Sequence, residues 1–226
     1  RLDHLHGCKK EDESKNHIIP GDSHAYHVTS SEMVASQEGA TLEIEDLHEL
    51  IAQALDQISF PATVADPEVQ GCPLIGVSPD FVALTQFPTA AILGRNCRFL
   101  NDGCHISTSA REGMRCCTRT GKHFSDVVAN QRADGTHFLN LLDMRGLIIG
   151  KYANTGDEKW VVIAVQEDVS SMEPSEIPFE HVDLMEELAK AIGDALTSSK
   201  NIFAHRGTLP AQQEPDVSTE SREPFL

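Results

Sequence analysis

One cysteine of this chain, Cys97, stands between an amide and a guanidinium in the stretch GRNCRFLN at residues 94–101. Neither neighbour would help a thiol that served only as a small apolar core residue. Guanidinium groups bind phosphate oxygens through paired hydrogen bonds, so Arg98 and, one predicted helix later, Arg115 are candidate phosphate ligands. Each arginine alone is more simply explained as a solvated surface charge. Together these residue types indicate a thiol placed near a phosphate.

Three amides lie in otherwise apolar rows of predicted strands. Because strand side chains alternate between faces, Asn130, Asn140 and Gln166 each share a face with apolar neighbours. A buried amide that is left unpaired costs about 1 to 3 kcal/mol. The alternative for each amide is a hydrogen bond to nearby backbone, but an apolar cavity with three convergent amides suits a flat heterocycle with donors and acceptors along its edge.

The turn between the first two of these strands decides whether Asn130 and Asn140 face the same way. Two residues that pair across the hairpin lie on the same face, so Asn130 and Asn140 share a face only if the residue numbers of each pair sum to an even value. A three-residue loop at 133–135 gives an even sum, and a two-residue loop gives an odd one. Gly135 suits the left-handed position of such a loop. A heterocycle edge, a phosphate clamp and a nearby thiol indicate flavin mononucleotide (FMN) with Cys97 over its ring.

The elements that must position these residues fall within residues 60–169. Strands, short helices, a longer helix and a three-stranded meander follow one another, which is typical of an α+β fold with helices packed on one face of an antiparallel sheet. We expect strands at 63–65, 74–77, 123–131, 136–149 and 159–169, and helices at 81–85, 90–93 and 111–120.

Amphipathic helices are predicted on both sides of this region, an N-terminal one at 41–59 and a C-terminal one at 178–199. The second carries an apolar heptad stripe, which serves either as a dimer seam or as the face that packs on its own domain. Residues 1–40 and 200–226 are polar or proline-rich, so we expect a disordered leader and a disordered tail. The stripe on the second helix is formed by Val182, Met185, Ala189, Ile192 and Leu196.

The composition excludes several classes of partner. The formal net charge of −17, from 35 acidic and 18 basic residues, argues against direct nucleic-acid binding and against anionic membranes. No apolar run approaches the roughly 18 residues of a membrane span, and the first residues lack the apolar core of a signal peptide. We therefore expect a cytoplasmic protein.

The stretch GRNCRFLN resembles GRNCRFLQ, the signature of LOV (light-oxygen-voltage) domains, which are the blue-light-sensing, flavin-binding branch of the PAS fold. The similarity covers about residues 60–170 and includes ADPEVQGCPLIGVS, FVALTQF, NQRADGTHFLNLL and VVIAVQEDVS. It implies a PAS fold, with a five-stranded antiparallel sheet and short helices on one face, flanked by the N- and C-terminal amphipathic helices.

The resemblance also implies roles for the candidate residues. Cys97 would be the photoactive cysteine, which forms a reversible cysteinyl-flavin adduct under blue light. The other positions would bind the cofactor: the flavin or its ribityl phosphate through Asn96, Arg98 and Asn101, the phosphate through Arg115, the pyrimidine edge through Asn130 and Asn140, and ring nitrogen 5 with its neighbouring carbonyl through Gln166.

The chain departs from the family pattern at several positions. Asn101 replaces the usual glutamine with a shorter amide, so its contact with the flavin is either lost or mediated by water. Gly76 stands where an aromatic residue is common, Gln86 replaces a glycine, and Leu139 replaces a tryptophan. The loop after Asn101 lacks the long insertion of FAD-binding members, so FMN is expected rather than FAD.

In this family the signal arises when ring nitrogen 5 changes from acceptor to donor, so that the Gln166 amide must present its oxygen instead of its NH₂. We expect the flanking helices to respond, through a light-dependent homodimer or contact with an effector protein, and we expect no enzyme activity in this chain. One alternative is an input module for a kinase or transcription factor outside this sequence. Another is a PAS domain whose flavin senses redox state.

Overall fold

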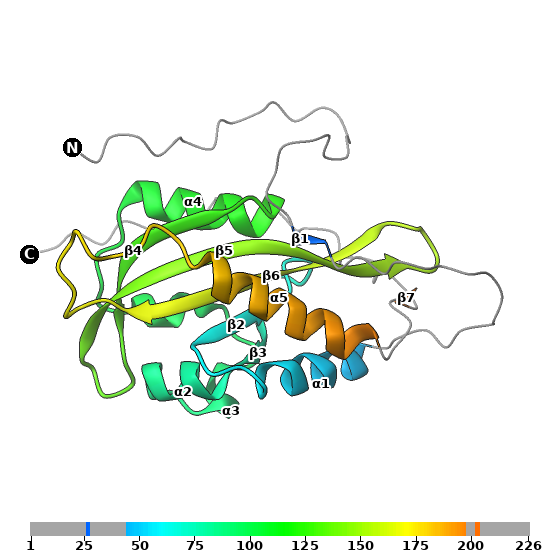
Figure 1. Cartoon of the computed structure of the whole chain (residues 1–226), viewed down its shortest axis with the longest axis horizontal. Coiled ribbons are helices and arrows are strands. Elements are labelled where there is room, and N and C mark those ends of the chain that lie inside the picture. Colours follow the sequence, from blue (N-terminus) through cyan, green and yellow to red (C-terminus); the bar gives the residue numbers. More distant parts are fainter. Residues whose placement is uncertain (1–25, 28–43, 198–201, 204–226) are drawn as a thin grey trace, which may run out of the picture.

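The structure is a computed structural model, and it describes residues 26–27, 44–197 and 202–203 of the 226. Five of its strands form an antiparallel sheet in the order β3-β2-β6-β5-β4, which confirms the predicted α+β PAS fold (Figure 1). Every predicted strand is present. Their bounds are Ala62–Ala65 (β2), Leu74–Val77 (β3), Phe124–Gln131 (β4), His137–Tyr152 (β5) and Glu158–Asp168 (β6).

Two further strands of two residues each pair in parallel with the far end of β5. They are β1, Tyr26–His27, beside residues 147–148, and β7, Ile202–Phe203, beside residues 151–152. Apart from these pairs, the expected leader at 1–40 and the expected tail at 200–226 lie outside the described residues.

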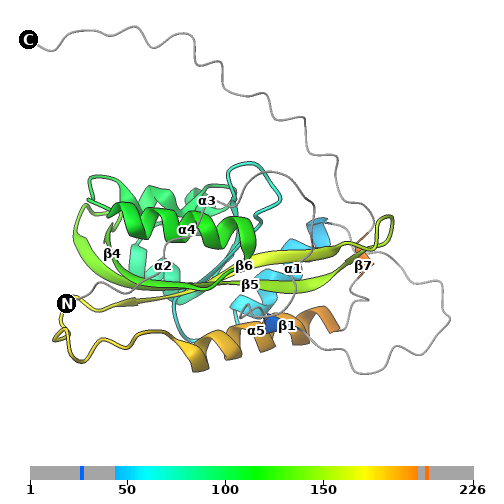
Figure 2. The ribbon, with the colours of Figure 1, turned by 90° about the horizontal axis from the view of Figure 1, so that it is seen from above.

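The helices divide between the two faces of the sheet. Figure 2 shows α2, α3 and α4 on one side, which we call the inner face, and α5 on the other, the outer face. None of the described helices is long and apolar enough to cross a membrane. The helix bounds are Ile44–Leu55 (α1), Pro79–Thr85 (α2), Thr89–Ile92 (α3), Thr108–Thr120 (α4) and Val182–Thr197 (α5), with a 3₁₀ helix, η1, at Cys97–Asn101.

The β4–β5 hairpin has the predicted even register. Asn130 pairs with Phe138 and Val128 pairs with Asn140, so both asparagines lie on the inner face. The loop consists of the three residues 133–135, closed by a hydrogen bond from the Arg132 amide to the Thr136 carbonyl. Gly135 has a φ of +86°, the left-handed conformation that favours glycine.

The outer face is covered by the two flanking helices. Helix α5 buries its apolar stripe against the sheet and against α1, since Met185, Ala189, Ile192 and Leu196 are buried and share one hydrophobic cluster with residues of both. Val182, the first residue of the predicted stripe, is 40% exposed. The sequence left two interpretations of this stripe, a dimer seam or packing on its own domain. In the described chain the stripe packs on its own domain.

Gly76 explains how α1 approaches the sheet. A Cβ built at this position would lie 2.5 Å from Ile51 Cγ2 and 2.6 Å from Leu55 Cδ1, both on α1. The two aliphatic side chains therefore occupy the space that a side chain on β3 would fill. The aromatic residue common at this position in the family would compete with α1 for the outer face.

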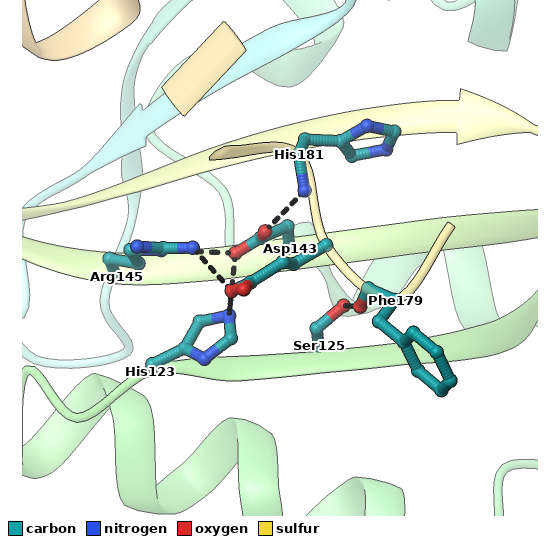
Figure 3. A network of polar contacts seen from close by, with 7 residues as sticks. His123, Ser125, Asp143, Arg145, Phe179 and His181 are labelled. Carbon is teal, nitrogen blue, oxygen red and sulfur yellow. Dashed lines mark hydrogen bonds and ion pairs between the residues drawn. The ribbon is translucent and has the colours of Figure 1, made fainter. Parts of the chain in front are cut away.

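A buried carboxylate, Asp143 on β5, anchors the start of α5 (Figure 3). Its side chain is fully buried and accepts hydrogen bonds from His123 Nε2 at 3.0 Å and from the His181 backbone amide at 2.8 Å. Arg145 Nε lies 3.4 Å from the same carboxylate, and Arg145 Nη2 pairs with Glu180 at 2.8 Å. We call His123, Asp143, Arg145, Glu180 and His181 the Asp143 cluster.

The electrostatics of the Asp143 cluster identify it as a structural ion-pair network. Burial raises the pKa of Asp143, but the hydrogen bonds from His123 and the His181 amide, with the Arg145 charge, lower it by more, so that it lies below its usual value. His123, Asp143 and Glu180 place possible metal ligands within 4.8 Å of one another. Arg145 already supplies a positive charge to both carboxylates, so we assign no metal to them.

Replacement of this carboxylate tests the cluster. Asp143→Asn should lower the free energy of unfolding by about 1 to 3 kcal/mol, because the negative charge beside Arg145 is lost and one acceptor oxygen becomes an NH₂ that faces another donor. Since the folded pKa lies below the unfolded value of about 3.9, the wild-type contribution is complete above that pH and is lost as pH falls through the folded pKa. Denaturant unfolding at several pH values checks both points. Asp56→Asn, which changes an exposed carboxylate, is the control and should stay within about 0.5 kcal/mol of wild type.

A second substitution tests how α1 is held. Gly76→Phe should loosen α1, because overpacking at this contact costs about 1 to 3 kcal/mol. Hydrogen exchange of residues 44–55 should accelerate, with a smaller effect for Gly76→Ala. Wild-type exchange rates in Gly76→Phe would show that α1 does not depend on the small residue at this contact.

Candidate functional site

Cys97 begins η1, and its neighbours hold this short helix in place. Asn96 caps η1, since its Oδ1 accepts hydrogen bonds from the Arg98 amide at 3.0 Å and from Arg98 Nε at 3.1 Å. Asn96 Nδ2 donates to the carbonyls of Gly71, at 2.5 Å, and Cys72, at 3.4 Å. Asn96 thus ties the start of η1 to the loop that follows β2, and its amide is engaged by the protein's own backbone.

The Cys97 thiol is kept protonated by its surroundings. Burial, with a smaller contribution from Cys72, raises its pKa to about 12. Both residues pack against the inner hydrophobic cluster that includes Leu74, Phe81 and Leu100. At neutral pH the group is therefore a thiol and not a thiolate, and a thiol is the poorer nucleophile in unaided chemistry.

Three asparagines form a hydrogen-bonded row that crosses from η1 to the sheet. Asn130 Nδ2 donates to Asn101 Oδ1 at 2.8 Å, and Asn140 Nδ2 donates to Asn130 Oδ1 at 2.8 Å. Asn130 and Asn140 are buried. The row ends at Asn140 Oδ1, which is buried and has no hydrogen-bond partner among the described residues. In this structure the Asn101 side chain therefore forms a hydrogen bond to Asn130 on the sheet. A contact of Asn101 with the flavin stays a prediction.

Gln166 stands beside this row on the neighbouring strand. It pairs with Leu142 on β5, while Asn140 pairs with Asp168, so both amides project from the inner face two positions apart. Gln166 Nε2 donates to Thr63 Oγ1 on β2 at 3.3 Å. Gln166 Oε1 is buried and, within the described part of the chain, lacks a hydrogen-bond partner.

These two unpaired oxygens provide a test of whether the residues fit a flavin. Each costs about 1 to 3 kcal/mol if nothing bonds to it, and both lie on the face that carries the apolar inner cluster. The polar edge of an oxidised flavin ring carries one N–H donor beside carbonyl and nitrogen acceptors, so it would satisfy one of these oxygens, and a second would need another ring nitrogen to carry a proton. The amides on the sheet therefore fit the cofactor that the sequence predicts.

The arginines are placed differently. Arg98 is exposed and its Nε bonds to Asn96, while Arg115 is exposed on α4. No hydrogen bond among the described residues joins either guanidinium to the asparagine row or to the other arginine. The phosphate clamp formed by these two side chains stays a prediction.

A further arginine, not predicted from the sequence, secures the strand end beside Gln166. Arg132 pairs with Asp168 on β6, donates from Nε to the Leu84 carbonyl at 2.9 Å, and lies 4.4 Å from the centre of the Phe138 ring. It thus joins the β4–β5 hairpin, α2 and β6. In the sequence, the one feature that pointed to Arg132 was its position directly before the predicted loop at 133–135.

Sequence reasoning also missed Thr63, the partner of Gln166. The signal for this residue was a single hydroxyl within the short apolar strand Ala62–Ala65. Its partner is 103 residues away in the chain, so the pair becomes visible only when β2 and β6 are placed side by side.

Comparison with known proteins gives several relatives, although no protein-family model matches the chain. The chain is 29% identical to "Blue-light-activated histidine kinase 2" of Erythrobacter litoralis over 138 residues, which cover 61% of this chain and 37% of that protein. It is 32% identical to "Phototropin-2" of Oryza sativa subsp. japonica over 92 residues, which cover 41% of this chain and 10% of that protein. The matches thus span well under half of either relative.

Among solved structures, the chain is similar to the LOV domain of the blue-light-activated histidine kinase of Erythrobacter litoralis EL346. The identity is 28% and the TM-score 0.43, with 51% of this chain and all of that chain covered. The cysteine signature, the five-stranded antiparallel sheet and the two curated relatives agree with one another. The chain is therefore similar in sequence to blue-light receptors and has the α+β fold of the PAS superfamily to which LOV domains belong.

Proposed function

We propose that this chain is a blue-light photoreceptor that binds FMN at the inner face, bonds to it reversibly through Cys97 and signals through its flanking helices. The observation that carries the proposal is a pair of buried oxygens on one face of the sheet, Asn140 Oδ1 and Gln166 Oε1, which have no hydrogen-bond partner among the described residues. The names of the relatives support the response to light.

The residues that would hold the cofactor come from three parts of the fold. Asn130, Asn140 and Gln166 would meet the polar edge of the ring from the sheet, and Asn96 and Asn101 would border it from either end of η1. Arg98 and Arg115 would bind the phosphate from the exposed side. FMN is favoured over FAD because only residues 102–107 connect η1 to α4, which leaves no long insertion to cover an adenine.

Bound FMN would supply the absorption of blue light and a ring carbon with which the Cys97 sulfur forms a reversible bond. The protein contributes a thiol whose high pKa keeps its proton in the dark. Because the thiolate is the reactive form in unaided chemistry, this protonation suppresses addition without light.

Gln166 is placed to pass the change outward. Its amide can present either NH₂ or oxygen to the inner face, so a ligand atom that changes from acceptor to donor would favour one orientation over the other. The Gln166 backbone amide donates to the Pro61 carbonyl, just before β2, at 2.9 Å. Its strand β6 leads toward α5, while β2 follows α1 in the chain. In the chain, α5 thus follows the strand that carries Gln166, and α1 precedes the neighbouring strand β2.

The output we propose is a change in protein contact, and we assign no enzyme activity to this chain. A shift of 1 to 3 kcal/mol in the Gln166 hydrogen bonds corresponds to about a 5- to 150-fold change in a two-state equilibrium. Release of α1 or α5 would expose their apolar faces to a second copy or to an effector. The relatives are longer proteins, so the chain serving as the input part of a larger effector is the alternative.

The proposal requires that the purified protein is yellow, binds FMN, bleaches under blue light and recovers in the dark. Cys97→Ala should retain FMN binding but lose the reversible bleaching, because the bond-forming sulfur is absent. Absorption spectra before and after illumination check both results. Cys104→Ala, which removes a free thiol outside the site, is the control and should bleach as wild type does. Protein that cannot be loaded with FMN would exclude the proposed function.

Gln166→Leu tests the route of the signal. The variant should still bleach under blue light, because the thiol is intact, but the light-induced change in hydrogen exchange of α1 and α5 should fall by at least half. The reason is that leucine has no hydrogen bond to rearrange. Gln131→Leu, which removes an amide from the other face of the β4–β5 hairpin, is the matched control. An unchanged response of both helices in Gln166→Leu would remove Gln166 from the route.

A further inference from the structure

Thr63 is the direct partner of the amide on which the proposed signal depends. Its Oγ1 accepts a hydrogen bond from Gln166 Nε2 at 3.3 Å, and both side chains are buried, Thr63 to 3% exposure. Gln166 Oε1, at the other end of the same amide, has no partner among the residues that the structure describes. The amide is therefore held at one end and unsatisfied at the other.

The position of Thr63 in the sheet explains this contact. It lies on β2 directly opposite Ala164 of β6, so Gln166 is its diagonal neighbour on the adjacent strand. Residues at such positions are about 7 to 8 Å apart at their Cα atoms, within reach of a long side chain. Ala65, on the same face of β2, belongs to the inner hydrophobic cluster, whereas Val64 belongs to the outer one. The Thr63 hydroxyl thus lies in the inner layer.

The hydroxyl of Thr63 can form a hydrogen bond to the Gln166 amide, which an apolar side chain at this position could not. In the structure the Thr63 hydroxyl acts as the acceptor for Gln166 Nε2, which is the orientation with the NH₂ toward β2. Valine or alanine at position 63 would leave this NH₂ without that acceptor.

We propose that Thr63 is a positioning residue that sets the orientation of the Gln166 amide and thereby the lifetime of the light state. This inference rests on the proposed function. In the structure Thr63 holds the NH₂ toward β2 and leaves the oxygen for the inner face. That orientation suits a ligand atom that carries a proton, which is the arrangement expected after illumination.

The loss of this hydroxyl should therefore destabilise the light-state orientation. A net hydrogen bond of ordinary strength corresponds to about a 2- to 10-fold change in rate or population. Thr63→Val should recover in the dark faster than wild type by about this factor. Its FMN content should be unchanged, because Thr63 is assigned no contact with the cofactor.

The experiment compares three variants of the full chain. Thr63→Ser keeps the hydroxyl and should recover at a rate close to wild type, while Thr63→Ala removes it and should follow Thr63→Val. Thr85→Val is the matched control, because Thr85 is also fully buried but its hydroxyl donates to the Phe81 carbonyl within α2. The measurements are the recovery half-time and the infrared difference band of the Gln166 side-chain carbonyl, assigned with isotope-labelled glutamine.

A third measurement needs no flavin. In flavin-free protein, solvent exchange of the Gln166 side-chain NH₂ protons, followed by NMR, should be faster in Thr63→Val and Thr63→Ala than in wild type and Thr63→Ser. If wild-type protein does not bind FMN or bleach, the proposed function fails, and this exchange rate still shows whether the hydrogen bond exists.

Two results would overturn the inference about Thr63. The first is that Thr63→Val and Thr63→Ala show the same dark-recovery rate, the same Gln166 carbonyl band and the same NH₂ exchange rate as wild type. The second is a change in Thr63→Ser as large as that in Thr63→Val, since a variant that keeps the hydroxyl would then behave like one that lacks it, and the effect would reflect packing at position 63. Should Thr63→Val fail to fold, the comparison of Thr63→Ala with Thr63→Ser decides the question.

Discussion

The register of the β4–β5 hairpin is the constraint on which the rest of this structure depends. A slip of one residue would turn Asn130 or Asn140 to the opposite face and break the hydrogen-bonded row that joins η1 to the sheet. Asn140 Oδ1 would then lie among the apolar residues that meet α1 and α5. A three-residue loop with Gly135 in the left-handed conformation fixes the register locally, so a single turn decides which side of the sheet carries the buried amides.

The inner and outer layers of the molecule differ in whether their buried groups are satisfied. Within the part of the chain that the structure describes, the inner layer leaves buried polar atoms without partners, which favours the binding of a ligand there. The outer layer is closed by aliphatic side chains of α1 and α5 and is fixed at the start of α5 by the Asp143 cluster. Such a division suits a sensor, because the part that meets the ligand can change its hydrogen bonds while the part that covers the other face keeps a defined resting state.

Much of this could be predicted from the sequence, because the governing interactions are local. The strand bounds and the hairpin register follow from alternation and from Gly135, and the cysteine signature marks η1. What could not be predicted depends on contacts between distant segments. Thr63 meets Gln166 across 103 residues, and Gly76 is explained only by α1 lying on β3. The Asp143 cluster likewise needs the linker before α5 folded back onto β5, where His181 meets Asp143.

Strand β5 carries both layers at once. Asn140 projects inward toward the proposed ligand and Asp143, three residues on, projects outward to the start of α5, a separation of about 10 Å along the strand. The two functions are therefore linked covalently through one short piece of backbone. A graft of the proposed sensor onto another output would have to keep β5 whole, because this one strand carries residues of both surfaces.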